Sequence, residues 1–176
     1  MSKSHFSNLT RLTTFFAFGN RLTLNVSHDW IPHFQLVILS LQSWKLGPEF
    51  PLWLCSQRCL LYLDISNTQI SDVIPPSIWN LSSLFIYLNI SHNQINGEIL
   101  NNPSIFSTSS VIDLSSNHFK GSLLYISSSV IVLDLSDNSF SKSISSFLCF
   151  KMNDSKSIGY LNLEKIIYQE KYLIVG

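Results

Sequence analysis

The fold is decided by the stretch Val130-Ile131-Val132-Leu133-Asp134-Leu135-Ser136-Asp137-Asn138-Ser139-Phe140. Apolar and polar residues alternate through Leu133, Asp134 and Leu135, and an asparagine follows three residues later. Successive side chains of a strand point to opposite faces, so the two leucines share one face and Asp134 lies on the other. The stretch therefore predicts a short strand with one buried face, which ends in a tight turn at Asn138.

The same pattern recurs five times upstream. Its asparagine position falls at residues 138, 117, 93, 68, 44 and 20, so successive copies lie 21 to 25 residues apart. This period and the L-x-x-L-x-L-x-x-N-x-L pattern are typical of leucine-rich repeats, and the period is too short for tetratricopeptide or ankyrin repeats. Six copies in one frame predict a solenoid in which each coil buries its leucines against the next.

The asparagine position predicts a structural ladder along one edge of the solenoid. An asparagine side chain carries an acceptor and two donors, so it can satisfy backbone groups on both sides of a turn. Trp44 and Thr68 replace it in two copies, where we expect a weaker ladder. The predicted ladder residues are Asn20, Asn93, Asn117 and Asn138.

A second motif follows each copy, as in Ile95-Asn96-Gly97-Glu98-Ile99. It resembles the x-L-x-G-x-I-P continuation of plant extracellular leucine-rich repeats, and residues 9–163 resemble the ectodomains of plant receptor-like proteins and receptor kinases. The resemblance implies a right-handed α/β solenoid shaped as a horseshoe. Short parallel strands would line its concave face, with loops and short helical turns on the convex face. Trp30, Trp53 and Trp79 are predicted to pack in the core.

The frame divides the chain into three parts. Residues 1–8 are predicted to begin a truncated repeat, 9–163 to form six copies plus a partial seventh, and 164–176 to be an out-of-frame tail. The sequence shows no signal peptide and no run of the ~20 apolar residues that a membrane span requires. The resemblance implies a position on the extracellular side of the plasma membrane.

The low content of charged residues limits the kinds of partner that the chain is expected to bind. Charged residues make up 12% of the chain and the formal net charge is zero, whereas about 25% charged residues is usual for soluble domains. Nucleic acid is therefore excluded as an expected partner. A surface rich in serine and asparagine suits a glycosylated extracellular protein. Predicted glycosylation sites are the sequons at Asn8, Asn25, Asn80, Asn89 and Asn153, and a glycan on Asn89 would project from the concave strand.

No combination of residues predicts catalysis, a cofactor or a metal site. Cys55 and Cys59 could form a disulfide in an oxidising compartment or stay reduced, and they lack the second ligand pair of a zinc site. Cys149 lies between apolar residues and is predicted to be a buried thiol. His92 and His118 flank asparagine turns as solvated residues. We therefore expect a protein that is not an enzyme.

The candidate ligand surface is the outward face of the strands. Asp64, Asp113 and Asp134 alternate with inward leucines, and less regular side chains flank them. Exposed aromatic residues on a concave surface suit peptide or glycan recognition. The candidate residues are Phe16, Phe18, Gln42, Tyr62, Asp64, Tyr87, Asp113 and Asp134.

By resemblance, the chain is expected to be a recognition module of a receptor-like protein that senses a peptide, protein or glycan in defence or development. Such receptors signal through a co-receptor kinase. Two alternatives stay open from the sequence. One is a secreted leucine-rich-repeat inhibitor of pathogen cell-wall hydrolases, and the other is a truncated gene product without function.

Overall fold

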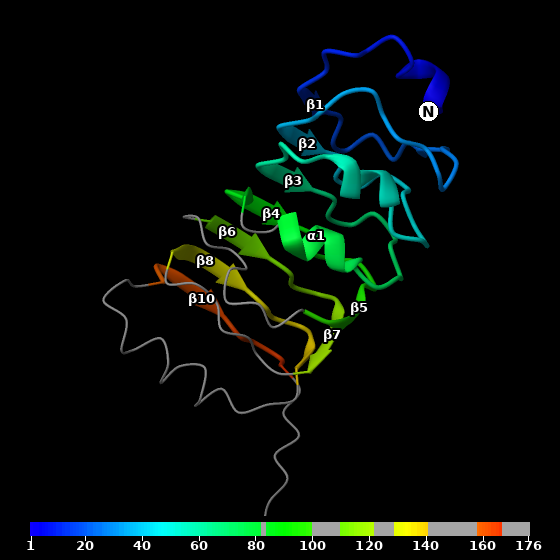
Figure 1. Ribbon diagram of the computed structural model, residues 1–176. Helices are drawn as coiled ribbons and strands as arrows, with labels where there is room; N and C mark the ends of the chain where they lie inside the picture. Colours follow the sequence, from blue (N-terminus) through cyan, green and yellow to red (C-terminus); the bar gives the residue numbers. More distant parts are fainter. Residues whose placement is uncertain (82–83, 100–109, 122–128, 141–157, 167–176) are drawn as a thin grey trace, which may run out of the picture.

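The structure is a computed structural model that describes residues 1–81, 84–99, 110–121, 129–140 and 158–166. In this part of the chain, seven short strands form one parallel sheet in the order β1-β2-β3-β4-β6-β8-β10 (Figure 1). Each copy of the frame supplies one strand, so the chain is the predicted leucine-rich-repeat solenoid. The strands are β1 Thr14–Phe16, β2 Ile38–Ser40, β3 Tyr62–Asp64, β4 Tyr87–Asn89, β6 Ser110–Asp113, β8 Val130–Asp134 and β10 Tyr160–Asn162.

The register of the sheet stacks equivalent leucines in columns. Leu39 pairs with Leu63, and Leu63 pairs with Leu88 one coil further on. Leu39, Leu63 and Leu133 are 0% exposed. The inward residue two positions later is buried as well, as Ile65 shows with 0% exposure. Burying one such side chain contributes about 1.5–3 kcal/mol relative to exposure. The core is therefore a continuous column in which each coil depends on its neighbours.

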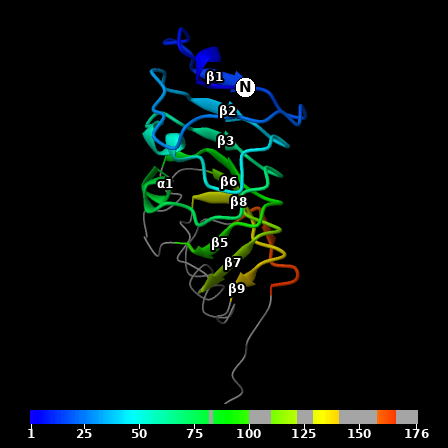
Figure 2. The same ribbon diagram turned by 90° about the vertical axis from the view of Figure 1, so that its right-hand side faces the viewer.

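A second, smaller parallel sheet forms where the second motif of the repeat was identified. It contains β5 Asn96–Glu98, β7 His118–Gly121 and β9 Ser139–Phe140, which lie side by side in Figure 2. The glycine of the motif adopts a positive φ at Gly97 (92°) and Gly121 (89°). Side chains with a Cβ rarely adopt this conformation, which explains glycine at these positions.

Three segments of the described chain form short helical turns. The 3-10 helix η2 spans Leu52–Ser56, the α-helix α1 spans Pro76–Leu81, and a further 3-10 helix, η1, spans Lys3–His5 (Figure 1). Proline suits the first helical position because its fixed φ matches the helix. Trp53 and Trp79 are buried, and the ring of Trp30 lies 5.5 Å from that of Trp53. The tryptophans are therefore part of the core.

Asn93 shows how the turns are tied together. Its Oδ1 accepts from the backbone N–H groups of Thr68 and Ile70 at 2.9 and 3.1 Å. Its Nδ2 donates to the carbonyls of Ile65 and Ile90 at 3.0 and 3.1 Å. Asn117 and Asn138 donate in the same way one and two coils on, and each accepts from one backbone N–H of the preceding coil, that of Ile95 or Phe119. Each of the three asparagines therefore joins its own turn to the preceding coil.

The first three coils depart from this arrangement. The exposed Asn20 donates to the carbonyls of Ala17 and Phe18 within its own turn. The indole Nε1 of Trp44 donates to the carbonyl of Ala17 in the coil before it. The hydroxyl of Thr68 donates to the Ile65 carbonyl at 2.8 Å. Trp44 and Thr68 thus each supply part of what an asparagine would.

Both ends of the described chain follow the solenoid. Phe6 is 6% exposed and its ring lies 5.7 Å from that of Phe15, so residues 1–8 pack on the first coil. In the seventh coil, Lys165 adopts the same left-handed φ of 51° as Asp137, and Ile166 is buried. Glu164 to Ile166 therefore still follow the frame, whereas 167–176 lie outside the described residues. The three-part division remains a prediction.

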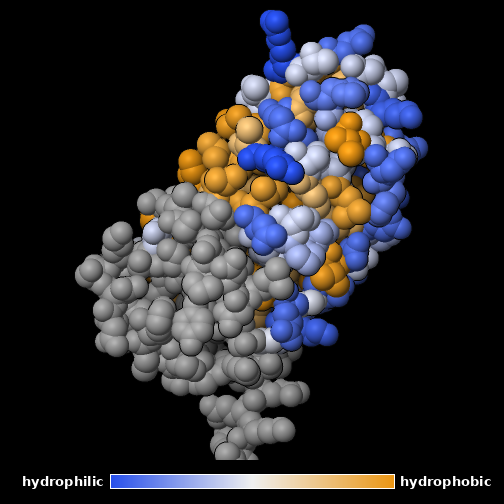
Figure 3. Space-filling model, in the orientation of Figure 1, coloured by the Kyte–Doolittle hydropathy of each residue, from blue (hydrophilic) through white to orange (hydrophobic). Residues whose placement is uncertain are grey.

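Some apolar side chains stay on the surface of the solenoid. Ile31, Ile86 and Ile131 are 68%, 52% and 50% exposed. Figure 3 shows apolar patches between polar areas on the face turned toward the viewer. Scattered exposed apolar residues are normal on a folded protein and do not by themselves define a binding site.

Candidate ligand-binding face

The outward face of the large sheet carries an aromatic cluster formed by Phe16, Tyr62 and Tyr87. Tyr62 and Tyr87 are register partners on β3 and β4, which places their rings parallel, with centroids 4.2 Å apart and 5° between the planes. The ring of Phe16 meets Tyr62 edge-on at 6.2 Å. Phe16 is 54% exposed, and Phe18, two residues on, is 61% exposed. A ligand on this face would meet rings whose positions neighbouring rings already fix.

The phenol of Tyr62 is unusually hard to ionise. Its pKa is raised to about 12, first because burial removes water from the charged form, and then because Tyr87 and Asp64 lie close to it. The ordinary tyrosine pKa is about 10. Tyr62 is therefore a neutral hydrogen-bonding group at physiological pH.

A pH titration of the tyrosines tests this environment. We expect one tyrosine, identified by its absence in Tyr62→Phe, to ionise near pH 12 in the ultraviolet difference spectrum. The pKa of Tyr62 in the folded protein lies above the value of about 10 in the unfolded chain. Its contribution to the free energy of unfolding is therefore fully present below pH ~10 and is lost as the pH rises from ~10 to ~12. If Tyr62→Phe removed a transition near pH 10, Tyr62 would be an ordinary exposed phenol.

A polar depression lies beside the aromatic cluster. Amide, hydroxyl, imidazole and carboxylate groups of β4, β6 and the turns after β2, β3 and β4 surround it, so it offers both donors and acceptors. The lining residues are Gln42, Ser66, Asn67, Asn89, Ser91, His92 and Asp113.

The aspartates between the inward side chains have a structural role. In the four coils that contain β3, β4, β6 and β8, the Oδ1 of the residue between the inward side chains accepts from the backbone N–H and the hydroxyl of a serine two residues on. For Asp113 and Ser115 the distances are 3.0 and 2.7 Å, and Asp64, Asn89 and Asp134 do the same. These bonds satisfy backbone at the point where the strand ends.

The three aspartates therefore differ as ligand contacts. Asp64 is only 7% exposed, so it offers little surface to a ligand, and its role as a ligand contact stays a prediction. The second oxygen of Asp134 accepts from Asn162 at 2.9 Å. Asp113 is half-buried and lines the depression. Of the three, Asp113 is the best placed to bind.

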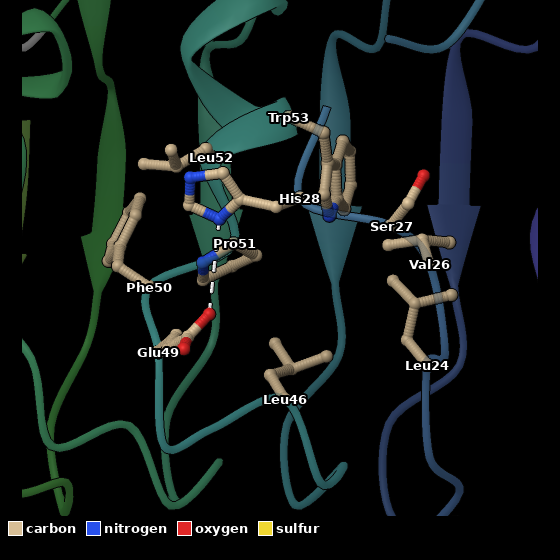
Figure 4. Close-up of a pocket in the computed structure, with 10 residues that line it drawn as sticks. All are labelled: Leu24, Val26, Ser27, His28, Leu46, Glu49, Phe50, Pro51, Leu52 and Trp53. Carbon is tan, nitrogen blue, oxygen red and sulfur yellow. Dashed lines mark ion pairs between the residues drawn. The ribbon is translucent and has the colours of Figure 1, made fainter. Parts of the chain in front are cut away.

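A second pocket, of about 110 Å³, opens between the loops of the first two coils (Figure 4). Leu24 and Val26 of one loop face Leu46, Phe50 and η2 of the next. His28 and Glu49, both largely exposed, form an ion pair at 3.9 Å on its rim. The buried indole Nε1 of Trp53 has no hydrogen-bond partner. The sequence did not predict this pocket, because nothing in it shows where adjacent loops fail to close.

A third pocket, of about 340 Å³, lies on the edge where the chain leaves the first three strands. It is lined by Arg21, Thr23, Ser43, Lys45, Asn67 and Gln69. Because Asn67 also lines the polar depression, the two sites adjoin. The sequence frame placed Arg21 and Lys45 at equivalent positions but did not single them out.

The remaining candidate residues take no part in these sites. Cys55 and Cys59 are free thiols, and Cys149 and Asn153 lie outside the described residues. Within the ranges that the structure describes, no three histidine, cysteine or acidic side chains are grouped to hold a metal. In the same ranges no helix combines the length and apolar character needed to cross a bilayer.

The structure ranks the sequons, whose occupancy is a prediction. Asn8, Asn25 and Asn80 are exposed, whereas the Asn89 amide donates to the Tyr87 hydroxyl at 3.4 Å and Ser91 is 2% exposed. In protein secreted from plant cells, we expect mass spectrometry to find glycans on the three exposed sites and the lowest occupancy at Asn89. Asn80→Gln should remove one glycan and Asn89→Gln none; a glycan lost with Asn89→Gln would contradict this ranking.

Comparisons with known proteins agree with the fold. A family model described as leucine rich repeat matches residues 59–81 and 129–150. Receptor-like protein EIX2 of Solanum lycopersicum is 41% identical over 150 residues, which cover 83% of this chain and 14% of the relative. Receptor-like protein EIX1 of the same species is 40% identical over 130 residues, covering 74% of this chain and 13% of the relative.

A solved structure shows the same likeness. It is that of the plant peptide hormone receptor RGFR1 in complex with RGF2, with a TM-score of 0.64 and 26% identity, covering 92% of this chain and 29% of that one. The fold and these matches define a parallel leucine-rich-repeat solenoid of the receptor ectodomain type. The chain belongs to the leucine-rich-repeat family of plant receptor-like proteins. It spans about one seventh of the length of the two tomato relatives.

Proposed function

We propose that this chain is a non-catalytic recognition segment of a plant cell-surface receptor-like protein, and that its sheet face binds a peptide. The observation that carries the proposal is the aromatic cluster next to the polar depression, in which Phe16 is exposed and Tyr62 and Tyr87 are half-buried. Among the similar proteins, RGFR1 is described as a peptide hormone receptor in complex with RGF2. The tomato relatives are receptor-like proteins, which favours a receptor over a secreted hydrolase inhibitor.

The chemistry of the face suits a peptide. A peptide backbone offers alternating N–H and C=O groups, and the depression presents donors and acceptors such as Asn89, His92 and Asp113. The aromatic cluster supplies rigid apolar contact at a low cost in side-chain entropy. Parallel strands lie about 4.8 Å apart, so an extended peptide crossing the strands contacts a new strand every one to two residues.

The wider setting follows from the relatives. As a segment of a receptor-like protein, the chain would lie on the extracellular side of the plasma membrane, carry glycans, and signal in defence or development through a partner kinase. A ligand bound across several coils would couple them, because each coil rests on its neighbours.

A peptide selection tests the proposal. A random peptide library displayed on phage is selected on the immobilised chain, and the selected peptides are titrated against Tyr62→Ala and Tyr87→Ala. Removing an aromatic anchor typically costs about 2 kcal/mol or more, so we expect affinity to fall roughly 30-fold. The matched control is Tyr160→Ala, because Tyr160 occupies the same register column on β10 and is 52% exposed. Peptides that bind all three variants as well as the parent would refute the proposed face.

A further inference from the structure

We propose that Arg21 and Lys45 form an anion subsite that takes a carboxylate of an acidic peptide bound to the sheet face. The identity of the ligand as a peptide rests on the proposed function; the subsite itself rests on the pocket at the edge of the first three coils. Its two cations come from equivalent positions of successive coils, each just after the asparagine position of the frame. The backbone N–H of Lys45 donates to the carbonyl of Leu22 at 2.8 Å, which holds the two segments together.

The composition of the pocket is that of an anion site. Arginine, lysine, serine, threonine, asparagine and glutamine line it, every one of these side chains carries an N–H or O–H donor, and no carboxylate is among them. The ion pairs of the described residues are His28–Glu49 and those of Lys165 with Asp137 and Glu164. Within that part of the chain, neither Arg21 nor Lys45 therefore has an acidic partner. A bound carboxylate would supply that acidic partner and accept from the arginine in a bidentate manner.

The backbone of this pocket also departs from the rest of the solenoid. A left-handed φ recurs in every coil at the residue before the asparagine position, as at Ser43 and Asn67. Arg21 (φ 48°) and Gln69 (φ 63°) adopt it one residue after that position, where the other coils whose equivalent residue the structure describes do not. Residues with a Cβ rarely take this conformation, and strained backbone tends to gather at binding sites. Arg21 and Gln69 both line this pocket. Their backbone conformation is therefore a second observation in favour of a binding site here, and it does not depend on charge.

The subsite is in reach of the sheet face. The Nδ2 of Asn67 donates to the Ser43 hydroxyl at 3.2 Å, which orients the amide between the pocket and the polar depression. A peptide in the depression can therefore place an acidic side chain beside Arg21 and Lys45. The ligand would have its anionic group toward the first coils, while Asp113 faces its other end.

The experiment compares two synthetic peptides that differ only in charge, N-acetyl-Tyr-Ala-Ser-Glu-Glu and N-acetyl-Tyr-Ala-Ser-Gln-Gln amides, titrated against the full chain at low salt. We expect the acidic peptide to bind at least 10-fold more tightly. The double variant R21Q/K45Q should abolish the preference, whereas K3Q/R58Q, which removes the same charge from exposed residues elsewhere, should keep it. The preference should also shrink as salt rises, because exposed charges are screened.

Each result has one meaning. Equal binding of both peptides, no binding of either, or a preference that survives R21Q/K45Q overturns the subsite. The proposed function would still stand if library peptides depend on Tyr62 and Tyr87, so the two failures are distinguishable. A tetragalacturonate oligosaccharide serves as a third probe. Binding of this probe that R21Q/K45Q abolishes, without binding of the acidic peptide, would assign the carboxylate to a glycan and overturn the peptide proposal.

Discussion

Replacing Asn93 with alanine is expected to lower the free energy of unfolding by about 3–5 kcal/mol, a large fraction of the stability of a typical domain. The Asn93 side chain accepts from the Thr68 and Ile70 N–H groups and donates to three carbonyls, those of Ile65, Ile90 and Ser91. Asn93 is 8% exposed, so water cannot replace these bonds. The loss comes from leaving several buried backbone groups unsatisfied at once. Urea unfolding followed by tryptophan fluorescence measures it.

Asn20 is the matched control, because it occupies the same position of the frame in the first coil. It is exposed and makes only bonds within its own turn, to the carbonyls of Ala17 and Phe18. We expect Asn20→Ala to cost no more than about 1 kcal/mol, since water can satisfy the freed groups. Similar losses for the two variants would mean that cross-linking of coils is not what the asparagine contributes.

The contrast between these two asparagines shows what the sequence could and could not predict. The period and the inward leucines depend only on residue order, and the large parallel sheet follows them strand by strand. Whether an asparagine of the frame joins two coils depends on whether backbone groups of the preceding coil lie within reach of its side chain. This is a property of the tertiary structure. The same limit applies to the buried Gln57, whose Oε1 accepts from the Leu36 N–H at 2.8 Å. No sequence pattern marked it, because its partner lies one coil away.

The candidate site was predictable to a similar extent. Alternation along the strands identified Phe16, Tyr62 and Tyr87 as outward residues. The structure brings them together because Tyr62 and Tyr87 lie on neighbouring coils and the ring of Phe16 on β1 reaches Tyr62 on β3. Alternation also predicted an open Asp64, which is buried. The period-2 rule gives the direction of a side chain but not what covers it. The pocket at Arg21 and Lys45 required the backbone conformation, which the sequence does not reveal for residues other than glycine.

Alanine at Gly47 is expected to destabilise the solenoid by at least about 3 kcal/mol, at the upper end of overpacking effects. A Cβ added there would lie 1.8 Å from the carbonyl oxygen of Gln69 and 2.7 Å from the backbone nitrogen of Ile70. Both atoms belong to the backbone of the next coil, so no side-chain rotation relieves the overlap. The N–H of Gly47 donates to the Thr68 carbonyl at 3.1 Å, which holds the two segments at this close approach. Thermal unfolding followed by circular dichroism is the measurement.

Gly19→Ala separates close approach from backbone conformation. Gly19 has a positive φ of 76° and nothing within 4 Å of an added Cβ, so alanine there should cost only about 1–2 kcal/mol. Which of the two variants is less stable therefore tests whether contact between coils, rather than backbone conformation, requires these glycines.

Because Gly47 presses against Gln69, Gly47→Ala should also displace one wall of the anion pocket. In the variant that stays folded at low temperature, the acidic peptide should then lose affinity while the aromatic cluster is unchanged. A Gly47→Ala protein as stable as Gly19→Ala would show that the coils can move apart without loss, contrary to the stacked core described above.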